Sequence, residues 1–358
     1  MKKIMTIVGA RPQFVKLAPL AKLLDPISEH MIIHTGQHFD DNMSQVFFDQ
    51  MNIRTPDLNL EISGGSHGKQ TGEMLIELEK VILDKCPDLV IVFGDTNSTL
   101  AGALAASKLH IPVLHIEAGL RSYDMKMPEE QNRVCVDHIS TFLSAPSERA
   151  VQNLKQEGIT KGVSLTGDIM RDSLAMVSTA NHVSDKIKSI KNEVNGNYVV
   201  LTLHRASNTD DKQLLTNIIN LIESSPFPVI FPVHPRTKNK FKEFNIVPSS
   251  PIKCIDPLGY LDMVQLLKDS TCVLTDSGGL QKEAYFLKKP CITIRDTTEW
   301  VETVENGCNT LVLSGVNALD KVAFTQALTA DVSSLQFPPV YGEKNVSQRI
   351  VALILNAV

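Results

Sequence analysis

Short, nearly all-apolar runs alternate with longer helical patterns along the whole chain, and this alternation limits the possible folds most. Five runs are Ile4–Val8, Met31–His34, Leu89–Phe93, Val113–Ile116 and Phe142–Ala145, and six more are Tyr198–Leu203, Val229–Val233, Ile252–Ile255, Cys272–Thr275, Cys291–Ile294 and Thr310–Leu313. They lack the apolar–polar alternation of half-exposed strands, which is typical of strands buried on both faces. Helices are expected between them, for example over Thr99–Leu109 and Gly279–Leu287. The repeated units predict an α/β protein with parallel sheets covered by helices on both sides.

A polar stretch, Asp168–Asn197, separates the two sets of runs and is interpreted as a connector. At roughly 150 residues per domain, the 358 residues predict two Rossmann-like, doubly wound domains, residues 1–168 and 169–342. The pattern over Val346–Val358 predicts a final helix. Ligands of such folds bind beyond the carboxyl ends of the strands. Functional residues are therefore expected directly after strands, in a crevice that the two domains share.

Composition argues against several classes of protein. The chain has 35 Lys and Arg against 40 Asp and Glu, a net charge of −5, without the basic excess of nucleic-acid binders. No apolar run approaches the roughly 18 residues of a membrane-spanning helix. Neither a nucleic acid nor a membrane is therefore expected as a partner. The six cysteines form no CxxC pair and mostly lie in apolar runs, so buried free thiols of a cytoplasmic protein are expected.

Acidic side chains follow two neighbouring runs of the first half. Asp95 comes directly after the third run and Glu117 directly after the fourth. Two acids at adjacent strand ends can hold separate pKa values and divide the roles of acid and base. The alternative for Asp95 is a cap on the next helix. A later segment opens a helix with Glu129 and Glu130, and favourable placement in the helix dipole is the alternative there.

Cationic side chains follow three other runs. Arg11 lies two residues beyond the turn after the first run, where it can pair with a phosphate; a salt bridge at the sheet edge is the alternative. Two runs of the second half end in His204 with Arg205 and in His234 with Arg236. No carboxylate or Cys lies nearby at ligand spacing, so this cationic group indicates anion binding rather than a metal site.

Small residues follow the run that ends at Thr275. Ser277, Gly278 and Gly279 open a helix, and backbone N–H groups at such a helix start can approach a phosphate. Glu283 lies one to two turns further on, where it can accept hydrogen bonds from ribose hydroxyls. An ordinary strand–helix turn is the alternative. The second half is therefore predicted to bind a nucleoside diphosphate.

Eight motifs stand in one order along the chain. They are GARPQ, GDTNST, HIEAGLRS, MPEEQNR, LHRASN, HPR, DSGGLQKEA and RDTTEW. This set resembles the non-hydrolysing UDP-N-acetylglucosamine 2-epimerase family, and the resemblance covers nearly the whole chain, to the final YGEKNVSQRI. It implies a GT-B architecture, which is two Rossmann-like domains around a cleft. It also implies that the C-terminal segment, residues 343–358, packs back on the first domain.

The resemblance implies an activity and a set of site residues. The family inverts C2 of a UDP-linked 2-acetamido sugar, by anti elimination of UDP to a 2-acetamidoglycal and re-addition, with no cofactor and no metal. It supplies precursors of surface polysaccharides. The implied catalytic residues are Asp95, Glu117, Glu129 and His204. The implied substrate-binding residues are Arg11, Arg133, Arg205, His234, Arg236, Ser277, Gly278, Gly279 and Glu283. The implied partners are the UDP-sugar and a second copy of the chain in a homodimer.

Departures from the family pattern leave the substrate open. GARPQ stands where most members begin GTRPE, and Trp300 follows Thr-Thr-Glu where many have TTERPE. The stretch GGSHGKQTG differs from the bacterial form with a second, activating sugar-nucleotide site. These features resemble a subgroup acting on UDP-2,3-diacetamido-2,3-dideoxy-glucuronate, although archaeal members assigned to the simpler substrate share the last one.

Three other interpretations remain beside the epimerases. A hydrolysing 2-epimerase would release N-acetylmannosamine and UDP, a GT-B glycosyltransferase would share the UDP site, and a sugar-nucleotide sensor would only bind. The carboxylates Asp95, Glu117 and Glu129 argue against the transferase and the sensor.

Overall fold

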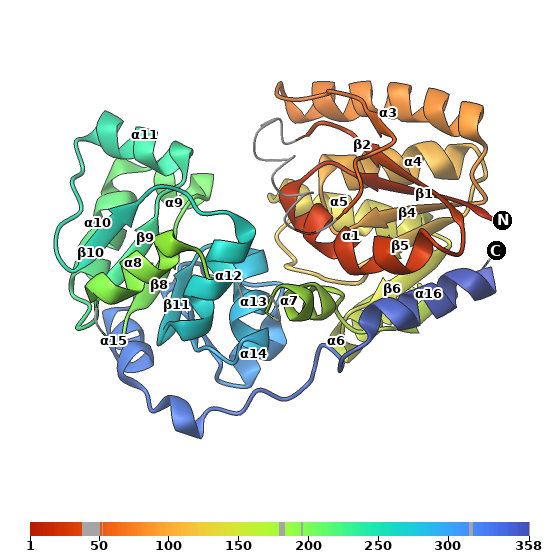
Figure 1. The fold of residues 1–358 in the computed structure, drawn as a ribbon. Helices are drawn as coiled ribbons and strands as arrows, with labels where there is room; N and C mark the ends of the chain where they lie inside the picture. Colours follow the sequence, from red (N-terminus) through yellow and green to blue (C-terminus); the bar gives the residue numbers. More distant parts are fainter. Residues whose placement is uncertain (38–50, 52, 179–182, 195, 315–317, 358) are drawn as a thin grey trace. The chain divides into compact units, whose positions relative to one another are not determined.

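The computed structural model describes residues 1–37, 51, 53–178, 183–194, 196–314 and 318–357. The chain divides into two compact units: a first unit, Met1–Met176 with Pro339–Val358, and a second unit, Val177–Pro338. Each unit contains a parallel sheet with helices on both faces (Figure 1). The predicted α/β class, with two doubly wound parts, is confirmed.

Within the described residues, the sheet of the first unit has seven parallel strands. From edge to edge they are β3 (Leu58–Asn59), β2 (Glu29–His34), β1 (Lys3–Val8), β4 (Leu89–Phe93), β5 (Val113–Ile116), β6 (Phe142–Ala145) and β7 (Val163–Leu165). The chain runs outward from β1 to β3 and then returns to the other side of β1, at β4. The carboxyl ends of β1 and β4 therefore form the topological switch point, where ligands of such sheets bind.

Helices cover both faces of this sheet. They are α1 (Arg11–Leu24), α3 (His67–Lys85), α4 (Asn97–Lys108), α5 (Pro128–Ile139), α6 (Glu148–Gln156), α7 (Met170–Ser178) and α16 (Val346–Ala357). One face packs against α3, α4 and α5. The small residues of α4 permit close packing on the sheet, since a Cβ added at Gly102 would lie 2.9 Å from Cδ1 of Ile7. In Figure 1, α1 and α16 lie on the other side of the sheet from α3 and α4.

The C-terminal segment completes the first unit. Helix α16 packs against α1 and buries Ile350 and Ile354. The carboxylate of Asp172, on α7, accepts hydrogen bonds from the backbone N–H groups of Asn345 (3.1 Å) and Ser347 (2.7 Å). Residues from the two ends of the chain therefore belong to one folded body.

The second unit repeats the doubly wound plan. Within the described residues, its parallel sheet has the order β10 (Ile252–Ile255), β9 (Val229–Pro232), β8 (Val199–Thr202), β11 (Cys272–Thr275), β12 (Cys291–Thr293) and β13 (Asn309–Leu311), and a short antiparallel pair joins β14 (Leu313–Ser314) to β15 (Ala318–Leu319). The chain reverses its direction of growth between β8 and β11. Their carboxyl ends form the switch point of this sheet.

Successive residues of these strands face opposite helical layers. Val199 and Leu201 lie in the core with α10 (Lys212–Glu223), α11 (Pro235–Phe244) and α15 (Lys321–Thr329). Val200 lies in the core with α8 (Asp185–Val194), α12 (Tyr260–Asp269) and α13 (Gly278–Phe286). The other helical segments are α9 (Ala206–Thr209), α14 (Val301–Glu305) and a 3₁₀ turn over Val332–Ser334. A sheet covered on both faces needs apolar residues on both, which explains why its strands show no alternation.

One prediction from the sequence is wrong, and another gains detail. The chain passes from the first unit to the second between Met176 and Val177, within the stretch interpreted as a connector. This stretch also contains α7 and α8, and Ile187 and Ile190 of α8 are buried in the second core. The cysteines are all free in the structure, but only three of the six are buried. The exposed ones are Cys86, Cys135 and Cys254. Cys86 follows the last residue of α3, and Cys135 and Cys254 lie within α5 and β10.

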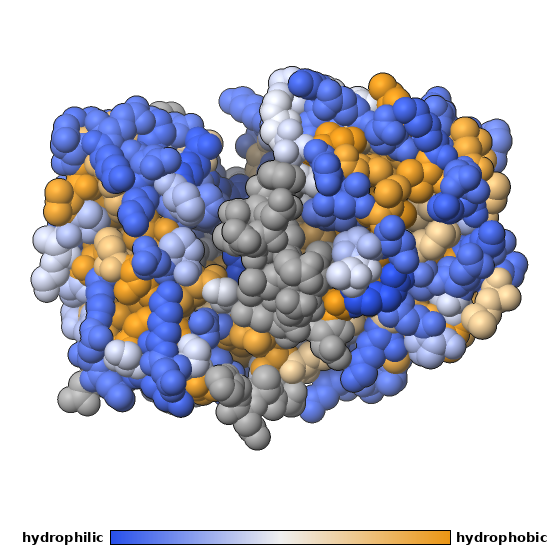
Figure 2. Space-filling model, turned by 45° about the horizontal axis from the view of Figure 1, so that its top comes forward, coloured by the Kyte–Doolittle hydropathy of each residue, from blue (hydrophilic) through white to orange (hydrophobic). Residues whose placement is uncertain are grey.

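The face drawn in Figure 2 is mostly hydrophilic, with smaller hydrophobic areas between polar and charged residues. Exposed apolar side chains include Ile76 and Leu83 on α3. Among the helices that the structure describes, none is both long enough and apolar enough to cross a membrane.

Candidate active site

Gln13 joins the two strand ends at the switch point of the first unit. Its Oε1 accepts hydrogen bonds from the backbone N–H groups of Gly9 (2.7 Å) and Ala10 (2.9 Å). Its Nε2 donates to the carbonyl of Phe93, the last residue of β4 (2.9 Å). Gln13 is buried, and its hydrogen bonds join the Gly9–Ala10 turn, directly before Arg11, to the end of β4.

Asp95 lies directly beyond β4 and binds a buried arginine. Nη2 of Arg133, on α5, lies 2.5 Å from Oδ2 of Asp95. The Asp95 side chain is 28% exposed, whereas that of Arg133 is only 4% exposed. Asp95 does not cap α4, because that role belongs to Thr96, whose side chain accepts from the N–H of Thr99 (3.2 Å). Asp95 is therefore available from solvent while a buried cation holds it in place.

Glu117, beyond β5, forms a buried ion pair with Lys16 of α1. The two side chains are 9% and 7% exposed. The backbone of Glu117 has φ +76°, in the left-handed region, and such strain costs of order 1–3 kcal/mol in a residue other than glycine. Strained residues cluster at functional sites, so this conformation is an independent reason to place Glu117 in the site.

The two acids in the first turn of α5 have different surroundings. Glu129 is exposed and makes no hydrogen bond or ion pair with the residues that the structure describes. Glu130 is buried and accepts from the N–H groups of Ser122 and Tyr123 (both 2.9 Å) and from Arg133 (2.7 Å). Glu130 therefore stabilises the fold, and Glu129 is the carboxylate that solvent can reach.

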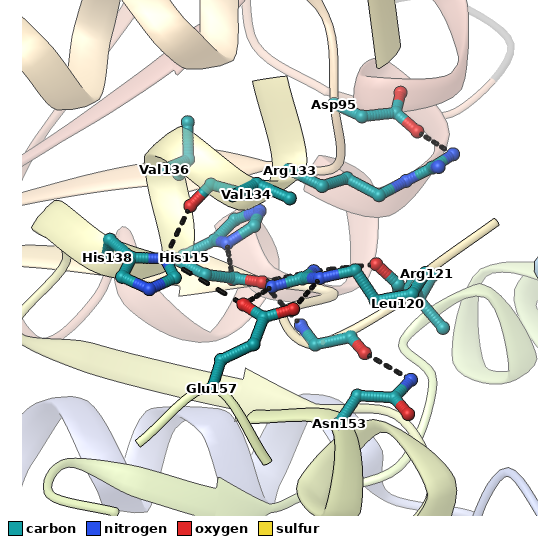
Figure 3. A network of polar contacts seen from close by, with 12 residues as sticks. Asp95, His115, Leu120, Arg121, Arg133, Val134, Val136, His138, Asn153 and Glu157 are labelled. Carbon is teal, nitrogen blue, oxygen red and sulfur yellow. Dashed lines mark hydrogen bonds and ion pairs between the residues drawn. The ribbon is translucent and has the colours of Figure 1, made fainter. Parts of the chain in front are cut away.

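A buried polar network lies beneath Asp95 (Figure 3). His115, on β5, places Nδ1 at 2.7 Å from Oδ1 of Asp137 and Nε2 at 2.8 Å from the carbonyl oxygen of Gly94. Arg121 donates to Oδ2 of Asp137 (2.7 Å) and forms a two-bond pair with Glu157 (2.6 and 2.7 Å). The network therefore fixes the carbonyl of Gly94, the residue immediately before Asp95.

Hydrogen bonding determines the charges in this network. Both partners of the His115 ring are acceptors when Asp137 is ionised, so each ring nitrogen must carry a proton. Burial raises the pKa of Asp137, but the bonds from His115 and the charge of Arg121 outweigh it and hold this pKa below its usual value. Burial also lowers the pKa of Arg121, and Glu157 with Asp137 more than reverses that effect. The four side chains form a network with balanced charges.

In the second unit, Asp276 joins the two strand ends at the switch point. It lies beyond β11, and its Oδ2 accepts from the backbone N–H groups of His204 (2.9 Å) and Arg205 (2.8 Å), beyond β8. Its Oδ1 lies 3.2 Å from Nδ1 of His204. His204 is thus a partly exposed imidazole held against a buried carboxylate, and the side chain of Arg205 lies half-buried beside it.

The second predicted His and Arg lie close by. The ring centre of His234 is 5.7 Å from that of His204, so the structure brings these two residues together. His234 also caps α11, since its Nδ1 accepts from the N–H of Arg236 (3.2 Å). Arg236 is exposed and bonded to both carboxylate oxygens of Asp210 (2.7 Å each).

The predicted small-residue turn opens α13. Ser277 is the N-cap residue, but its hydroxyl makes no capping hydrogen bond. A Cβ added at Gly278 would lie 2.2 Å from Oε1 of Glu299, so packing requires a glycine there. A Cβ added at Gly279 would meet nothing closer than Oγ of Ser277 at 3.9 Å. The helix start therefore has open space at Gly279, where an anion can approach its N–H groups. Glu283 lies buried one turn further along α13.

Known proteins place the chain in a family. The profile of UDP-N-acetylglucosamine 2-epimerases matches residues 24–355. The chain is 49% identical to a UDP-N-acetylglucosamine 2-epimerase homolog of Methanococcus maripaludis, over 99% of both chains. The chain belongs to the UDP-N-acetylglucosamine 2-epimerase family.

Solved structures of this epimerase family agree with that conclusion. The UDP-GlcNAc 2-epimerase of Methanocaldococcus jannaschii, in complex with UDP-GlcNAc and UDP, superposes with a TM-score of 0.89 at 43% identity, over 99% of this chain and 100% of that one. A UDP-2,3-diacetamido-2,3-dideoxy-D-glucuronate 2-epimerase of Pseudomonas aeruginosa is 50% identical, over 87% of this chain and 88% of its own. The family predicted from the eight motifs is confirmed.

Several polar residues of this epimerase-family chain escaped the sequence analysis. Lys16 interrupts the apolar face of α1, and a lone cation in such a face was the signal for it. Asp276 follows an apolar strand directly, as Asp95 does, so the same rule should have selected it. Arg295 and Glu299 form a buried ion pair (2.9 Å). Nζ of Lys282, on α13, lies 4.1 Å from the ring centre of Trp300, the residue that departs from the TTERPE pattern.

Proposed function

We propose that this protein is a non-hydrolysing epimerase that inverts C2 of UDP-N-acetylglucosamine. The observation that carries the proposal is the pair of carboxylates Asp95 and Glu117, which follow neighbouring strands and are each held by a buried cation. The Asp95 side chain is partly exposed and the Glu117 side chain is buried, so the two carboxylates have different surroundings, and two such groups can serve as acid and base. The nearly full-length relatives that act on UDP-sugars support the same activity.

The proposed reaction has two stages. In the first, a base takes the proton from C2, the C1–O bond breaks, and UDP leaves with the bonding electrons to give a 2-acetamidoglycal. In the second, an acid delivers a proton to the opposite face of C2, and the UDP oxygen bonds again to C1. Asp95, Glu117, Glu129 and His204 are assigned to these proton transfers. The C2 hydrogen is not next to a carbonyl, so its removal depends on stabilisation of the departing diphosphate.

The second unit is assigned to the nucleotide. The start of α13 is assigned to the diphosphate: Gly278 and Gly279 supply backbone N–H groups, and Ser277 supplies its hydroxyl. The remaining proposed ligands of the UDP-sugar are arginines, one histidine and one buried acid. They are Arg11, Arg133, Arg205, His234, Arg236 and Glu283.

A specific observation supports a second candidate substrate, the UDP-2,3-diacetamido uronate. The Pseudomonas aeruginosa relative named for that substrate is 50% identical to this chain, and the Methanocaldococcus jannaschii relative named for UDP-N-acetylglucosamine is 47% identical. These values are too close to separate the two substrates, so both belong in the decisive experiment.

The decisive experiment is incubation of the protein with each UDP-sugar in heavy water, followed by NMR. Epimerisation should place deuterium at C2 while UDP remains attached, because the proton returns from a group that exchanges with solvent. Release of free sugar and UDP would instead indicate a hydrolysing enzyme. Transfer to an added acceptor without deuterium at C2 would indicate a glycosyltransferase.

Two substitutions test the nucleotide site. Ser277→Ala removes a hydroxyl donor and Arg236→Ala removes a cation, and hydrogen bonds to charged groups contribute about 1.5–3 kcal/mol each. UDP should therefore bind roughly ten- to a hundredfold more weakly to each variant, as calorimetry would measure. Lys238→Ala is the matched control, because it removes an exposed cation of the same helix that pairs only loosely with Asp256 (3.5 Å). Unchanged affinity in both variants would exclude this site.

A further inference from the structure

The two oxygens of Asp276 have different surroundings. Oδ2 accepts three hydrogen bonds, from the backbone N–H groups of His204 and Arg205 and from Nδ2 of Asn208 (3.3 Å). Oδ1 faces Nδ1 of His204 at 3.2 Å. The side chain of Asp276 is completely buried, whereas that of His204 is 40% exposed. Oδ1 makes no hydrogen bond within the described structure, and Nδ1 of His204, which donates when protonated, lies at ion-pair distance from it.

This arrangement determines which nitrogen of His204 is free to act. In a histidine, the partner of one ring nitrogen decides where the proton of the neutral ring lies. The carboxylate of Asp276 favours a proton on Nδ1 and leaves Nε2 with its lone pair. The adjacent His234 has the opposite form, because its Nδ1 accepts from the N–H of Arg236 and its proton must therefore lie on Nε2.

We propose that Asp276 is a positioning residue that holds His204 in the Nδ1-protonated form, with Nε2 as the atom that exchanges a proton during epimerisation. This inference rests on the proposed function, which gives His204 its role. Nε2 accepts or returns one proton, and the charge of Asp276 stabilises the imidazolium that forms. Asp276 remains an ionised carboxylate throughout. The same carboxylate also fixes the backbone of His204, so it sets both the place and the tautomer of the ring.

The substitution Asp276→Asn tests this role. The amide oxygen still accepts from the backbone, but the NH₂ group then faces Nδ1 and forces the ring proton onto Nε2. The same exchange in a carboxylate–histidine pair lowers turnover by about 10⁴-fold with the geometry intact, so a loss of that order is expected, with UDP affinity retained.

A double-mutant cycle separates this role from a structural one. If Asp276 acts through His204, then Asp276→Asn combined with His204→Gln loses no more turnover than His204→Gln alone. A loss of turnover in the double variant equal to the product of the two single losses would overturn the proposal. Thr202→Val is the matched control, because it removes a side-chain hydrogen bond between the same two strand ends, between Thr202 Oγ1 and Thr275 Oγ1 (2.6 Å), and leaves the carboxylate of Asp276 in place. It should keep the turnover of the unmodified protein.

A direct measurement needs no variant. Nitrogen-15 NMR of the histidines in the unmodified protein identifies the protonated ring nitrogen of His204, and a neutral ring with its proton on Nε2 would overturn the inference. Failure of the proposed function looks different, since the unmodified protein would then not epimerise either UDP-sugar. An active protein whose Asp276→Asn variant keeps full turnover would contradict this inference alone.

Discussion

Glu117→Gln should lower turnover at least about a hundredfold while the variant still binds UDP. Proton transfer by a positioned side chain contributes about 10²–10⁴-fold to a rate, and an amide cannot supply it. UDP binding should survive because the proposed nucleotide site lies in the second unit. Asp95→Asn and Glu129→Gln should show losses of the same order. The effect of Glu129→Gln is the easiest of the three to interpret. Glu129 makes no hydrogen bond or ion pair with the described residues, so the substitution breaks none.

The structure changes the expected effect of Glu117→Gln on stability. From the sequence, neutralising one of three neighbouring acids should relieve repulsion and leave the protein equally or more stable. In the structure, Glu117 is the buried partner of Lys16. Loss of one charge from a buried ion pair typically costs about 3–5 kcal/mol, because the other charge stays buried. We therefore expect a clear fall in the free energy of unfolding.

Turnover and urea unfolding of three variants separate the two effects. Lys16→Met combined with Glu117→Gln removes both charges and should recover most of the stability, but it should remain inactive. Glu73→Gln is a control for loss of a carboxylate, because Glu73 is exposed and forms a long surface ion pair with Lys69 (3.7 Å). If each of the three single variants Glu117→Gln, Asp95→Asn and Glu129→Gln kept near-normal turnover, the acid–base assignment would be refuted. A transferase or a sensor would then be favoured.

Asp137→Asn should destabilise the first unit more than any exposed substitution. Asp137 is the completely buried acceptor that links His115 to Arg121, and its neutralisation leaves both cations short of a counter-ion. The expected cost is about 3–5 kcal/mol, a large part of the roughly 5–15 kcal/mol that stabilises a typical domain. Glu157→Gln is the matched comparison, and a smaller loss is expected there because the Glu157 side chain is partly exposed.

The effect of Asp137→Asn should depend on pH in one direction. The folded protein holds the pKa of Asp137 below its usual value, so the stabilisation is complete above the unfolded pKa of about 3.9. It is lost as the pH falls from there through the folded pKa. Urea unfolding at neutral pH and below pH 4 should therefore show a deficit that shrinks in acid. A deficit that stays constant would mean that charge is not the cause.

The location of the site followed from the sequence because its strands are marked by their apolar runs. Asp95, Glu117 and His204 each come directly after such a run, and the end of a buried strand is the one place where a polar residue can enter a ligand site of this fold. Neighbouring strands bring such ends together whatever the helices do. The structure therefore places His204 beside His234, at the ends of neighbouring strands, as the sequence predicted.

The partners of these residues could not be predicted in the same way. Lys16, on α1, meets Glu117, beyond β5, although about a hundred residues separate them, and no sequence pattern indicates that contact. Asp137, on α5, meets His115, on β5, through the packing of that helix, which sequence rules do not specify. The positive φ of Glu117 is also invisible to sequence rules, since they assign such angles to glycine or asparagine.

The contact between α16 and α1 has a consequence for synthesis on the ribosome. Domains generally fold as units while the chain emerges, the N-terminal one first. Here the first unit lacks α16 until Val346–Ala357 are translated, and these residues follow the whole second unit along the chain. The side of α1 that α16 covers therefore stays uncovered during most of translation, and the unit that begins the chain is the last to be completed.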